Sequence, residues 1–254
     1  MVETTRNTQK VFRPNMDEKR KKEEMKYDSS AYLTLNDLRT DLPSLSFDIV
    51  SEENILGQKI RFPIQTTFVA GTQAPKGKAN KVSIFRVSNI QKTKYDDGNT
   101  SSDDSDEGKN SLKTDDIDPV IKEMSFNHPG AINRIRTMPQ NNKIISTWSD
   151  NSKVYAWNAS DLFDGLKNTK TEKSLEKKNT LKPIGCNEKH SCEGFALSWN
   201  PHVEGTLISG DCNGAIYLNQ INTENLDVSK TEFKGHLDSV EDVQWDSSNQ
   251  HVIF

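Results

Sequence analysis

One pattern of alternating apolar and polar residues occurs three times in this chain, at residues 133–158, 195–221 and 235–254. Each copy alternates and then turns at a cluster of Asp, Asn, Gly or Ser. Half-buried antiparallel strands joined by tight turns have this appearance in a sequence. The repetition therefore predicts an all-β chain built from the blades of a β-propeller.

The spacing of the copies agrees with a WD40 β-propeller, whose blades repeat every 40–45 residues or so. Thr137, Trp199 and Trp245 occupy the same slot of the pattern, and the interval between the two tryptophans is close to that period. The interval from Thr137 to Trp199 is longer, because a Lys-rich insert at residues 167–182 lies between the two copies. We expect this insert to be a loop between blades.

Each copy carries part of the WD blade signature, which opens with Gly-His and closes with Trp-Asp. The closing pair is degenerate, since one copy has Trp157-Asn158 and the next has Asn219-Gln220. We assign structural roles in the blades to the glycine, the histidine and three tryptophans, which are Trp157, Trp199, Gly235, His236 and Trp245.

A propeller removes its sheet edges by closing a ring, usually of seven blades. With a weaker blade at residues 59–90, the chain reaches only its fourth repeat at Phe254. We expect that these repeats alone do not close a ring, as in a truncated form; a natural short form and a ring completed by a partner are the alternatives. The last repeat is then expected to be poorly ordered and prone to aggregate.

Composition divides the chain into a flexible polar arm at residues 1–26, a helix and a strand at residues 27–50, and a partial propeller at residues 51–254. Hydrophobic residues make up 32% of the chain, and no apolar run approaches the roughly 18 residues that span a bilayer. The N-terminus has no hydrophobic signal core. These features predict a protein of the cytosol or nucleus that does not bind a membrane.

The polar arm contains four consecutive basic residues, Lys19, Arg20, Lys21 and Lys22, flanked by acidic residues. Such a tetrad is typical of a nuclear import signal, and a solvated helix with alternating charge blocks is the alternative.

The next segment predicts a short amphipathic helix at residues 29–40. Its apolar stripe is formed by Ala31 and by the three partner-binding candidates Tyr32, Leu35 and Leu38, and Pro43 ends it. Residues 44–50 then alternate as a strand does, with Leu45, Phe47 and Ile49 on one face.

Residues 96–118 form an acidic low-complexity segment with too few large apolar residues to fold alone. Its nine carboxylates outnumber Lys109 and Lys113, and they are Asp96, Asp97, Asp103, Asp104, Asp106, Glu107, Asp115, Asp116 and Asp118. We expect this acidic loop to attract basic proteins and repel nucleic acid phosphates. A solubilising insert without a specific partner is the alternative. Ser101, with Asp104 three residues on, is a possible phosphorylation site that would add charge.

No feature of the sequence predicts catalysis, a metal or a cofactor. Cys186, Cys192 and Cys212 lack metal-ligand spacing, and the motifs of nucleophilic or metal-dependent hydrolases are absent. The Lys-rich insert has no aromatic residue for base stacking, so we expect no sequence-specific nucleic acid binding. We therefore expect that the protein is not an enzyme.

Eight segments, taken in order, are similar to the glutamate-rich WD-repeat family, which lies close to the histone-binding retinoblastoma-associated WD proteins. They are residues 11–14, 30–32, 45–50, 70–73, 128–136, 193–199, 209–212 and 235–245. The position of the acidic loop, just before His128, also agrees with this family. The loop departs from it in being Asp-rich and shorter than the long Glu tract expected.

The resemblance implies a seven-bladed propeller in the nucleus and nucleolus with a non-enzymatic role in assembly of the large ribosomal subunit. It also implies two kinds of basic partner: a large-subunit ribosomal protein, the third in the standard numbering, and core histones. In the histone-binding relatives, the helix corresponding to residues 29–40 forms part of a groove for a partner helix. Our leading hypothesis is a chaperone whose acidic loop screens the ribosomal protein, and the alternative is a histone chaperone or chromatin adaptor.

Overall fold

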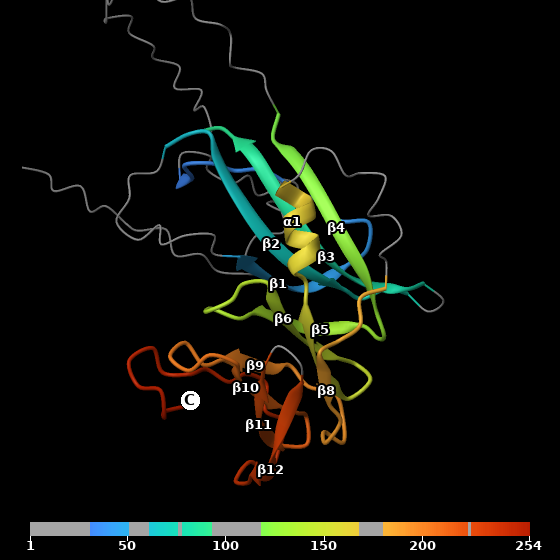
Figure 1. The fold of residues 1–254 in the computed structure, drawn as a ribbon, viewed down its shortest axis with the longest axis vertical. Coiled ribbons are helices and arrows are strands. Elements are labelled where there is room, and N and C mark those ends of the chain that lie inside the picture. The colour runs from blue at the N-terminus through green and yellow to red at the C-terminus, as the bar shows by residue number, and fades with distance from the viewer. Residues whose placement is uncertain (1–30, 51–60, 76–77, 93–117, 168–179, 223–224) are drawn as a thin grey trace, which may run out of the picture.

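The computed structural model of the chain describes residues 31–50, 61–75, 78–92, 118–167, 180–222 and 225–254. These residues form three four-stranded antiparallel sheets, and in each sheet the strand order follows the chain. The predicted all-β, WD40-like architecture is confirmed. Figure 1 shows the first sheet at the top, the second in the middle and the third at the bottom.

The strands of each sheet are consecutive in sequence. The first sheet contains β1 (Ser44–Val50), β2 (Ile64–Thr72), β3 (Asn80–Ile90) and β4 (Val120–His128). The second contains β5 (Ile132–Thr137), β6 (Ile144–Ser149), β7 (Lys153–Asn158) and β8 (Gly185–Asn187). The third contains β9 (Ala196–Trp199), β10 (Thr206–Gly210), β11 (Ile216–Ile221) and β12 (Leu226–Phe233). The weak blade predicted at residues 59–90 is thus the middle of a longer sheet.

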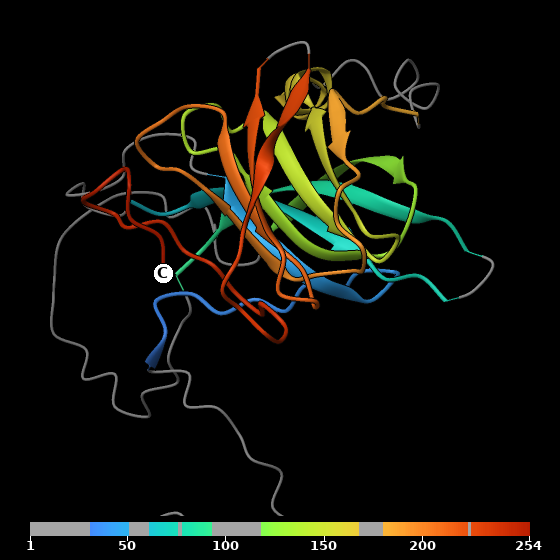
Figure 2. The ribbon, with the colours of Figure 1, turned by 90° about the horizontal axis from the view of Figure 1, so that it is seen from below.

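Figures 1 and 2 show from two directions that the three sheets are layered on one another. The layers meet through buried apolar side chains. Phe126 and Ile84 of the first sheet pack with Ile135 of the second in one buried cluster. Trp148 of the second sheet and Leu207 of the third belong to a second cluster. Burial of apolar area contributes roughly 25 cal/mol per Å², so these two layers are the main source of stability.

Strand β1 lies against β5 of the next sheet, and polar side chains join the two strands. The hydroxyl of Ser46 accepts a hydrogen bond from the amide of Ile135 at 3.1 Å. Asp48 accepts bonds from both the amide and the hydroxyl of Thr137, each at 2.7 Å. The opposite, apolar face of β1 is the exposed one, since Phe47 and Ile49 are each 63% exposed. The predicted alternation is therefore present, but the polar face is the one that packs.

The one helix of the described residues, α1 (Ser160–Lys167), packs across the first sheet near β4. Asn158, which stands where a WD blade has Asp, caps it by accepting bonds from the amide and hydroxyl of Ser160. Leu162, Phe163 and Leu166 are buried in the first cluster. No helix in the described part of the chain is long and apolar enough to cross a membrane.

The helix predicted at residues 29–40 is wrong for the part that the structure describes. Residues 31–43 contain no α-helix. Polar side chains bond locally instead: Asn36 donates to the Thr34 hydroxyl at 2.9 Å, and Thr40 donates to the Leu42 carbonyl at 2.7 Å. Thr, Asn and Asp compete with the helical backbone in this way, and a helix this short is marginal without packing.

The last repeat, residues 235–254, packs on the third sheet without forming a sheet of its own. It contains a single bridge between Trp245 and Ile253. Val240, Val243 and Trp245 are buried beside Ile208. The apolar contact between blades thus extends to the fourth repeat.

Asn219 of β11 occupies the position of the tryptophan in a WD signature and joins two sheets. Its amide nitrogen donates to the Ser209 hydroxyl at 3.1 Å, and its oxygen accepts from Asn187 of β8 at 2.9 Å. Neither asparagine is accessible to solvent. Removal of either side chain would leave a buried polar group of its partner without a hydrogen bond.

We expect Asn219→Ala to destabilise the chain by about 1–3 kcal/mol, because Asn187 and Ser209 would keep buried groups without partners. Urea unfolding followed by tryptophan fluorescence measures this loss. Asn225→Ala, which removes an exposed side chain just before β12, is the control and should change stability by less than about 0.5 kcal/mol. Equal effects of the two substitutions would contradict the role assigned to Asn219.

Candidate functional site

Most of the binding residues proposed from the sequence lie outside the described residues. These are the basic tetrad Lys19, Arg20, Lys21 and Lys22, the possible phosphorylation site Ser101, and every carboxylate of the acidic loop except Asp118. The structure does describe the two strands that bracket the acidic loop, β3 and β4. Asn89 donates to the Asp118 carbonyl at 3.3 Å, and Ser88 pairs with Val120 in the ladder. The two strands on either side of the acidic segment are therefore adjacent in one sheet where the chain leaves β3 and enters β4.

The partner-binding stripe predicted on a helix is not assembled, because that helix is absent. Tyr32 is 44% exposed and Leu38 is 43% exposed, while Leu35 is half-buried. Without a helical repeat, these side chains do not share one face.

Two histidines form buried networks at the start of a blade, and the sequence analysis missed both. His128 lies within 2.8 Å of the Gly130 carbonyl through Nδ1 and within 2.9 Å of the Thr147 hydroxyl through Nε2. Because a carbonyl only accepts, Nδ1 carries the proton and the Thr147 hydroxyl donates to Nε2. Trp157 in turn donates to Thr147 at 2.9 Å. The chain His128–Thr147–Trp157 is fully satisfied.

The third sheet repeats this arrangement around His190. Its Nδ1 donates to the Asp211 carboxylate at 2.9 Å, and its Nε2 accepts from the Ser209 hydroxyl at 2.8 Å. Asn219 then donates to Ser209, as Trp157 does to Thr147. His236 belongs to the Gly-His pair to which the sequence pattern assigns a structural role. It is exposed and makes no such bond among the described residues, so that structural role stays a prediction.

The environments of these two histidines favour the neutral ring. Burial lowers the pKa of His128 to about 4, although the Gly130 carbonyl and Asp150 act in the opposite direction. Burial also lowers the pKa of His190, and the bond to Asp211 only partly offsets it. Both rings are enclosed by aromatic neighbours, with Tyr155 against His128 and Trp148 and Tyr217 against His190. Burial and complete hydrogen bonding indicate a structural role for both rings.

Two of the tryptophans assigned to the blades donate a hydrogen bond to the backbone of the preceding repeat. Trp199 donates to the carbonyl of Arg136 at 3.2 Å, and Trp245 donates to the carbonyl of Ser198 at 3.1 Å. Arg134 adds a link that the sequence did not indicate. Its guanidinium donates to the Phe195 carbonyl at 2.6 Å and to the Glu241 carbonyl at 3.4 Å. Arg134 thus connects three successive repeats.

The three cysteines do not form a metal site with other residues. In the described part of the chain, no group of three or more His, Cys, Asp or Glu side chains is arranged to hold a metal ion. Burial raises the pKa of both Cys186 and Cys192, so their thiols are poor nucleophiles at neutral pH.

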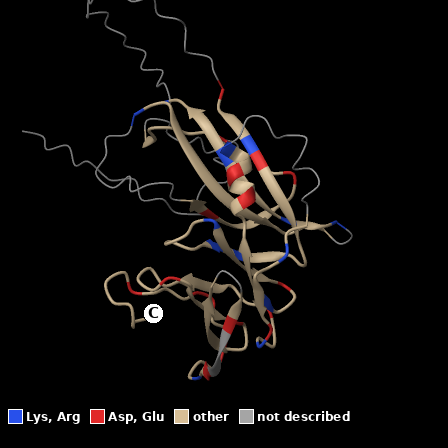
Figure 3. Ribbon diagram, in the orientation of Figure 1, with Lys and Arg blue, Asp and Glu red and all other residues tan. Residues whose placement is uncertain are grey.

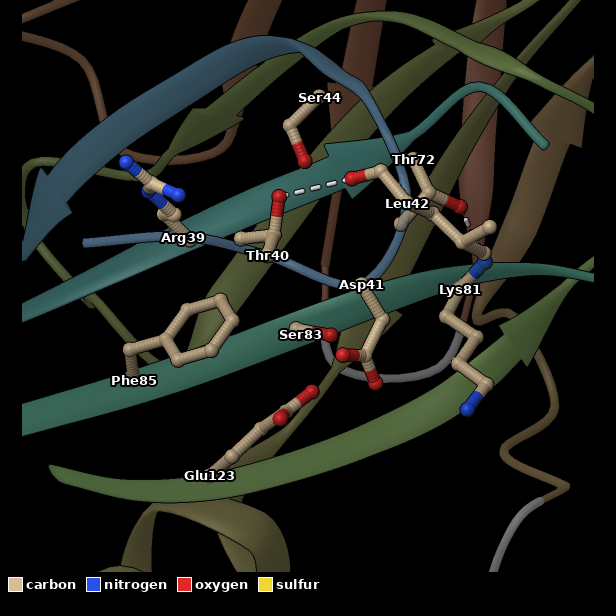
Figure 4. A pocket seen from close by; sticks show the side chains of 10 residues that line it. All are labelled: Arg39, Thr40, Asp41, Leu42, Ser44, Thr72, Lys81, Ser83, Phe85 and Glu123. Carbon is tan, nitrogen blue, oxygen red and sulfur yellow. Dashed lines mark hydrogen bonds between the residues drawn. The ribbon is translucent and has the colours of Figure 1, made fainter.

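A pocket of about 90 Å³ lies where residues 39–44 cross the exposed face of the first sheet (Figure 4). Asp41 and Thr40 form its rim from one side, and Ser83 and Glu123 face them from β3 and β4. Its lining combines carboxylates, cations, hydroxyls and one aromatic ring.

The chain is similar to known proteins of two descriptions, a histone-binding family and WD-repeat proteins. Residues 22–91 match a family model described as the histone-binding protein RBBP4, or a subunit of the CAF1 complex. Over 96% of its length the chain is 37% identical to glutamate-rich WD repeat-containing protein 1 of Dictyostelium discoideum, of which it covers 50%. The resemblance to the glutamate-rich WD-repeat family is confirmed.

Two further relatives agree with it. Protein HEAT STRESS TOLERANT DWD 1 of Arabidopsis thaliana is 33% identical over 96% of this chain and 55% of its own length. Ribosome assembly protein rrb1 of Schizosaccharomyces pombe is 29% identical over 91% of this chain and 46% of its own length. The chain spans about half the length of each of these three relatives. The histone-binding match covers β1, β2, β3 and the segment that forms the pocket rim.

We expect the stability of the chain to fall as the pH is lowered from 6.5 towards 4. In that window an unfolded His128 binds a proton that the folded, buried ring does not, so the loss grows until the pH passes the folded pKa of about 4. A shift of this size corresponds to about 3 kcal/mol at most. His190 acts in the same direction.

Urea unfolding at pH 6.5 and near pH 4 measures this dependence, and His128→Gln is the comparison. The variant should start less stable but lose less on acidification. Parallel losses in the two proteins would contradict the assignment of the acid sensitivity to His128.

Proposed function

We propose that this chain is a non-enzymatic chaperone or scaffold in assembly of the large ribosomal subunit, acting in the nucleus and nucleolus. Its acidic loop, residues 96–118, screens the positive charge of a basic large-subunit ribosomal protein, the third in the standard numbering. The similarity to a ribosome assembly protein supports the process, and the composition of the loop supports the mechanism.

The observation that carries this proposal is the concentration of nine carboxylates and only two lysines in one segment. In the described residues, acidic and basic groups are interspersed over the three sheets, as Figure 3 shows. The chain as a whole has a net charge of −4, so the loop dominates its electrostatic character. A concentrated anionic segment attracts a cationic client over a distance set by the Debye length, about 8 Å at physiological salt.

The place of the loop in the fold suits this role. Both of its ends are fixed to β3 and β4, which are paired along nine positions from Asn80 to Ser88. The acidic segment is therefore connected at both ends to two paired strands of one sheet. Screening by such a segment is reversible, and so the client can be released when ribosomal RNA competes for it.

A second candidate function is a histone chaperone or chromatin adaptor. The family match at residues 22–91 favours it, because the description of that family names histone binding. Histones and ribosomal proteins are both strongly basic, so the acidic loop serves either client. Microscopy of the tagged protein separates the two: accumulation in nucleoli supports the ribosomal role, and a distribution over chromatin supports the histone role.

We expect neutralisation of the loop, with its Asp and Glu residues replaced by Asn and Gln, to weaken binding of the ribosomal protein about tenfold at low salt, because the long-range attraction is lost. Isothermal titration of the purified partners at about 0.05 M and 0.5 M salt measures this. The difference between wild type and variant should shrink at high salt.

The control replaces the six lysines of the insert at residues 167–182 by Gln, which changes charge in a neighbouring connection but leaves the acidic loop intact. This variant should bind the basic client at least as well as the wild type. Unchanged affinity of the loop-neutralised variant at low salt would refute the role of the loop.

A further inference from the structure

The pocket on the exposed face of the first sheet has the features of a site for a cationic side chain. It is lined by two carboxylates, a hydroxyl and an aromatic ring, from Asp41, Glu123, Ser83 and Phe85. Figure 4 shows the two carboxylates and the hydroxyl directed into the same space. These four side chains come from three separate elements, the segment before β1 and strands β3 and β4.

Ser83 gives the clearest indication that the pocket binds something. Its side chain is only 5% exposed, and its hydroxyl has no hydrogen-bond partner among the described residues. The hydroxyl is reached from the pocket, so its hydrogen-bonding capacity is directed at whatever occupies that space. The hydroxyl faces the pocket, where a bound group supplies that partner.

The rim that carries Asp41 is held in place. The Pro43 carbonyl accepts a bond from the amide of Gln73 at 2.8 Å, which fastens the segment to the end of β2. The bond from Thr40 to the Leu42 carbonyl closes a turn around Asp41. On the floor, the Phe85 ring stacks on Phe68 with 5.0 Å between centroids. The donor and acceptor positions are therefore set before a ligand arrives, which reduces the entropic cost of binding.

Two cations, Arg39 and Lys81, also border the pocket, but they do not neutralise its carboxylates by contact. Figure 4 shows the Arg39 guanidinium directed away from Asp41 and Glu123, and the Lys81 ammonium on the opposite side of Asp41 from Glu123. Among the described residues, neither forms an ion pair with Asp41 or Glu123. The two carboxylates remain available to an incoming cation.

We propose that this pocket receives an arginine or lysine side chain from a basic polypeptide, and that it fixes one point of a client whose bulk charge the acidic loop screens. The inference rests on the proposed function for its client. A guanidinium or ammonium group donates charge-assisted hydrogen bonds to Asp41 and Glu123 and places its charge near the Phe85 ring. The volume of about 90 Å³ suits such a head group, since one water occupies roughly 30 Å³ of liquid.

The test uses the full 254-residue chain and a fluorescent octa-arginine peptide, followed by anisotropy at low salt. We expect the double variant Asp41→Asn, Glu123→Gln to raise the Kd about tenfold. Ser83→Ala should raise it by about threefold, because it removes one acceptor without changing charge. The matched control, Glu204→Gln with Asp227→Asn, makes the same charge change at exposed positions of the third sheet and its loop and should stay within about twofold.

The loop-neutralised variant, measured with the same peptide, separates this inference from the proposed function. Weaker binding by the loop variant alone, with the pocket variants at wild-type affinity, overturns the pocket and leaves the proposed function intact. Weaker binding by the pocket variants alone supports the pocket and removes the loop from the proposed function. Equal weakening by the pocket pair and the control pair shows that only net charge matters, and it overturns the pocket inference.

Discussion

Burial of one apolar sheet face against the next is the interaction on which the rest of this structure depends. A single repeat of this kind cannot bury its hydrophobic face alone, and here each sheet buries large side chains by packing on a neighbour. Trp148 is fully buried between the second and third sheets, and Phe126 is 1% exposed between the first and second. The dependence runs in both directions along the chain, because removing an inner layer exposes a face on each of its two neighbours. This is why the last repeat, with a single bridge of its own, still buries Trp245 against the third sheet.

Hydrogen bonds between the layers decide how the sheets are positioned, since apolar contact alone does not set a register. His128 and His190 make the same pattern of hydrogen bonds at two places in the fold. In each, the ring donates from Nδ1 and accepts at Nε2 from a buried hydroxyl. A buried network of this kind stabilises a unique arrangement only when every member has a partner. The replacement of tryptophan by Asn219 keeps the scheme satisfied and adds a bond to Asn187 of the preceding sheet. Asn219, the degenerate residue of the signature, therefore adds a hydrogen bond between two neighbouring sheets.

Alternation and spacing in the sequence were sufficient to predict the all-β class, the three clear repeats and the positions of Trp157, Trp199 and Trp245. The opening histidines of two blades were missed because neither follows a glycine: Asn127 precedes His128, and Lys189 precedes His190. A search for His followed by a buried Ser or Thr some twenty residues on would have found both. The helix at residues 29–40 failed because helical spacing was read without the competing side-chain bonds of Asn36 and Thr40. The pocket was not predictable, since Asp41, Ser83 and Glu123 come together only through the pairing of β3 with β4 and the crossing of the segment before β1.

The two anionic features differ in what they contribute to binding a basic client. A run of carboxylates in a low-complexity segment attracts at a distance and raises the rate of encounter, but it does not discriminate among cationic sequences. A pair of carboxylates fixed on strands and on a fastened turn acts only at contact, where geometry counts. Ser83 and Phe85 add requirements that a bulk charge does not satisfy. A chaperone that must hold a basic protein and later release it to RNA benefits from this division, because added salt or a competing polyanion weakens the long-range attraction first. In this proposal, the contact at the pocket sets which segment of the client is held last.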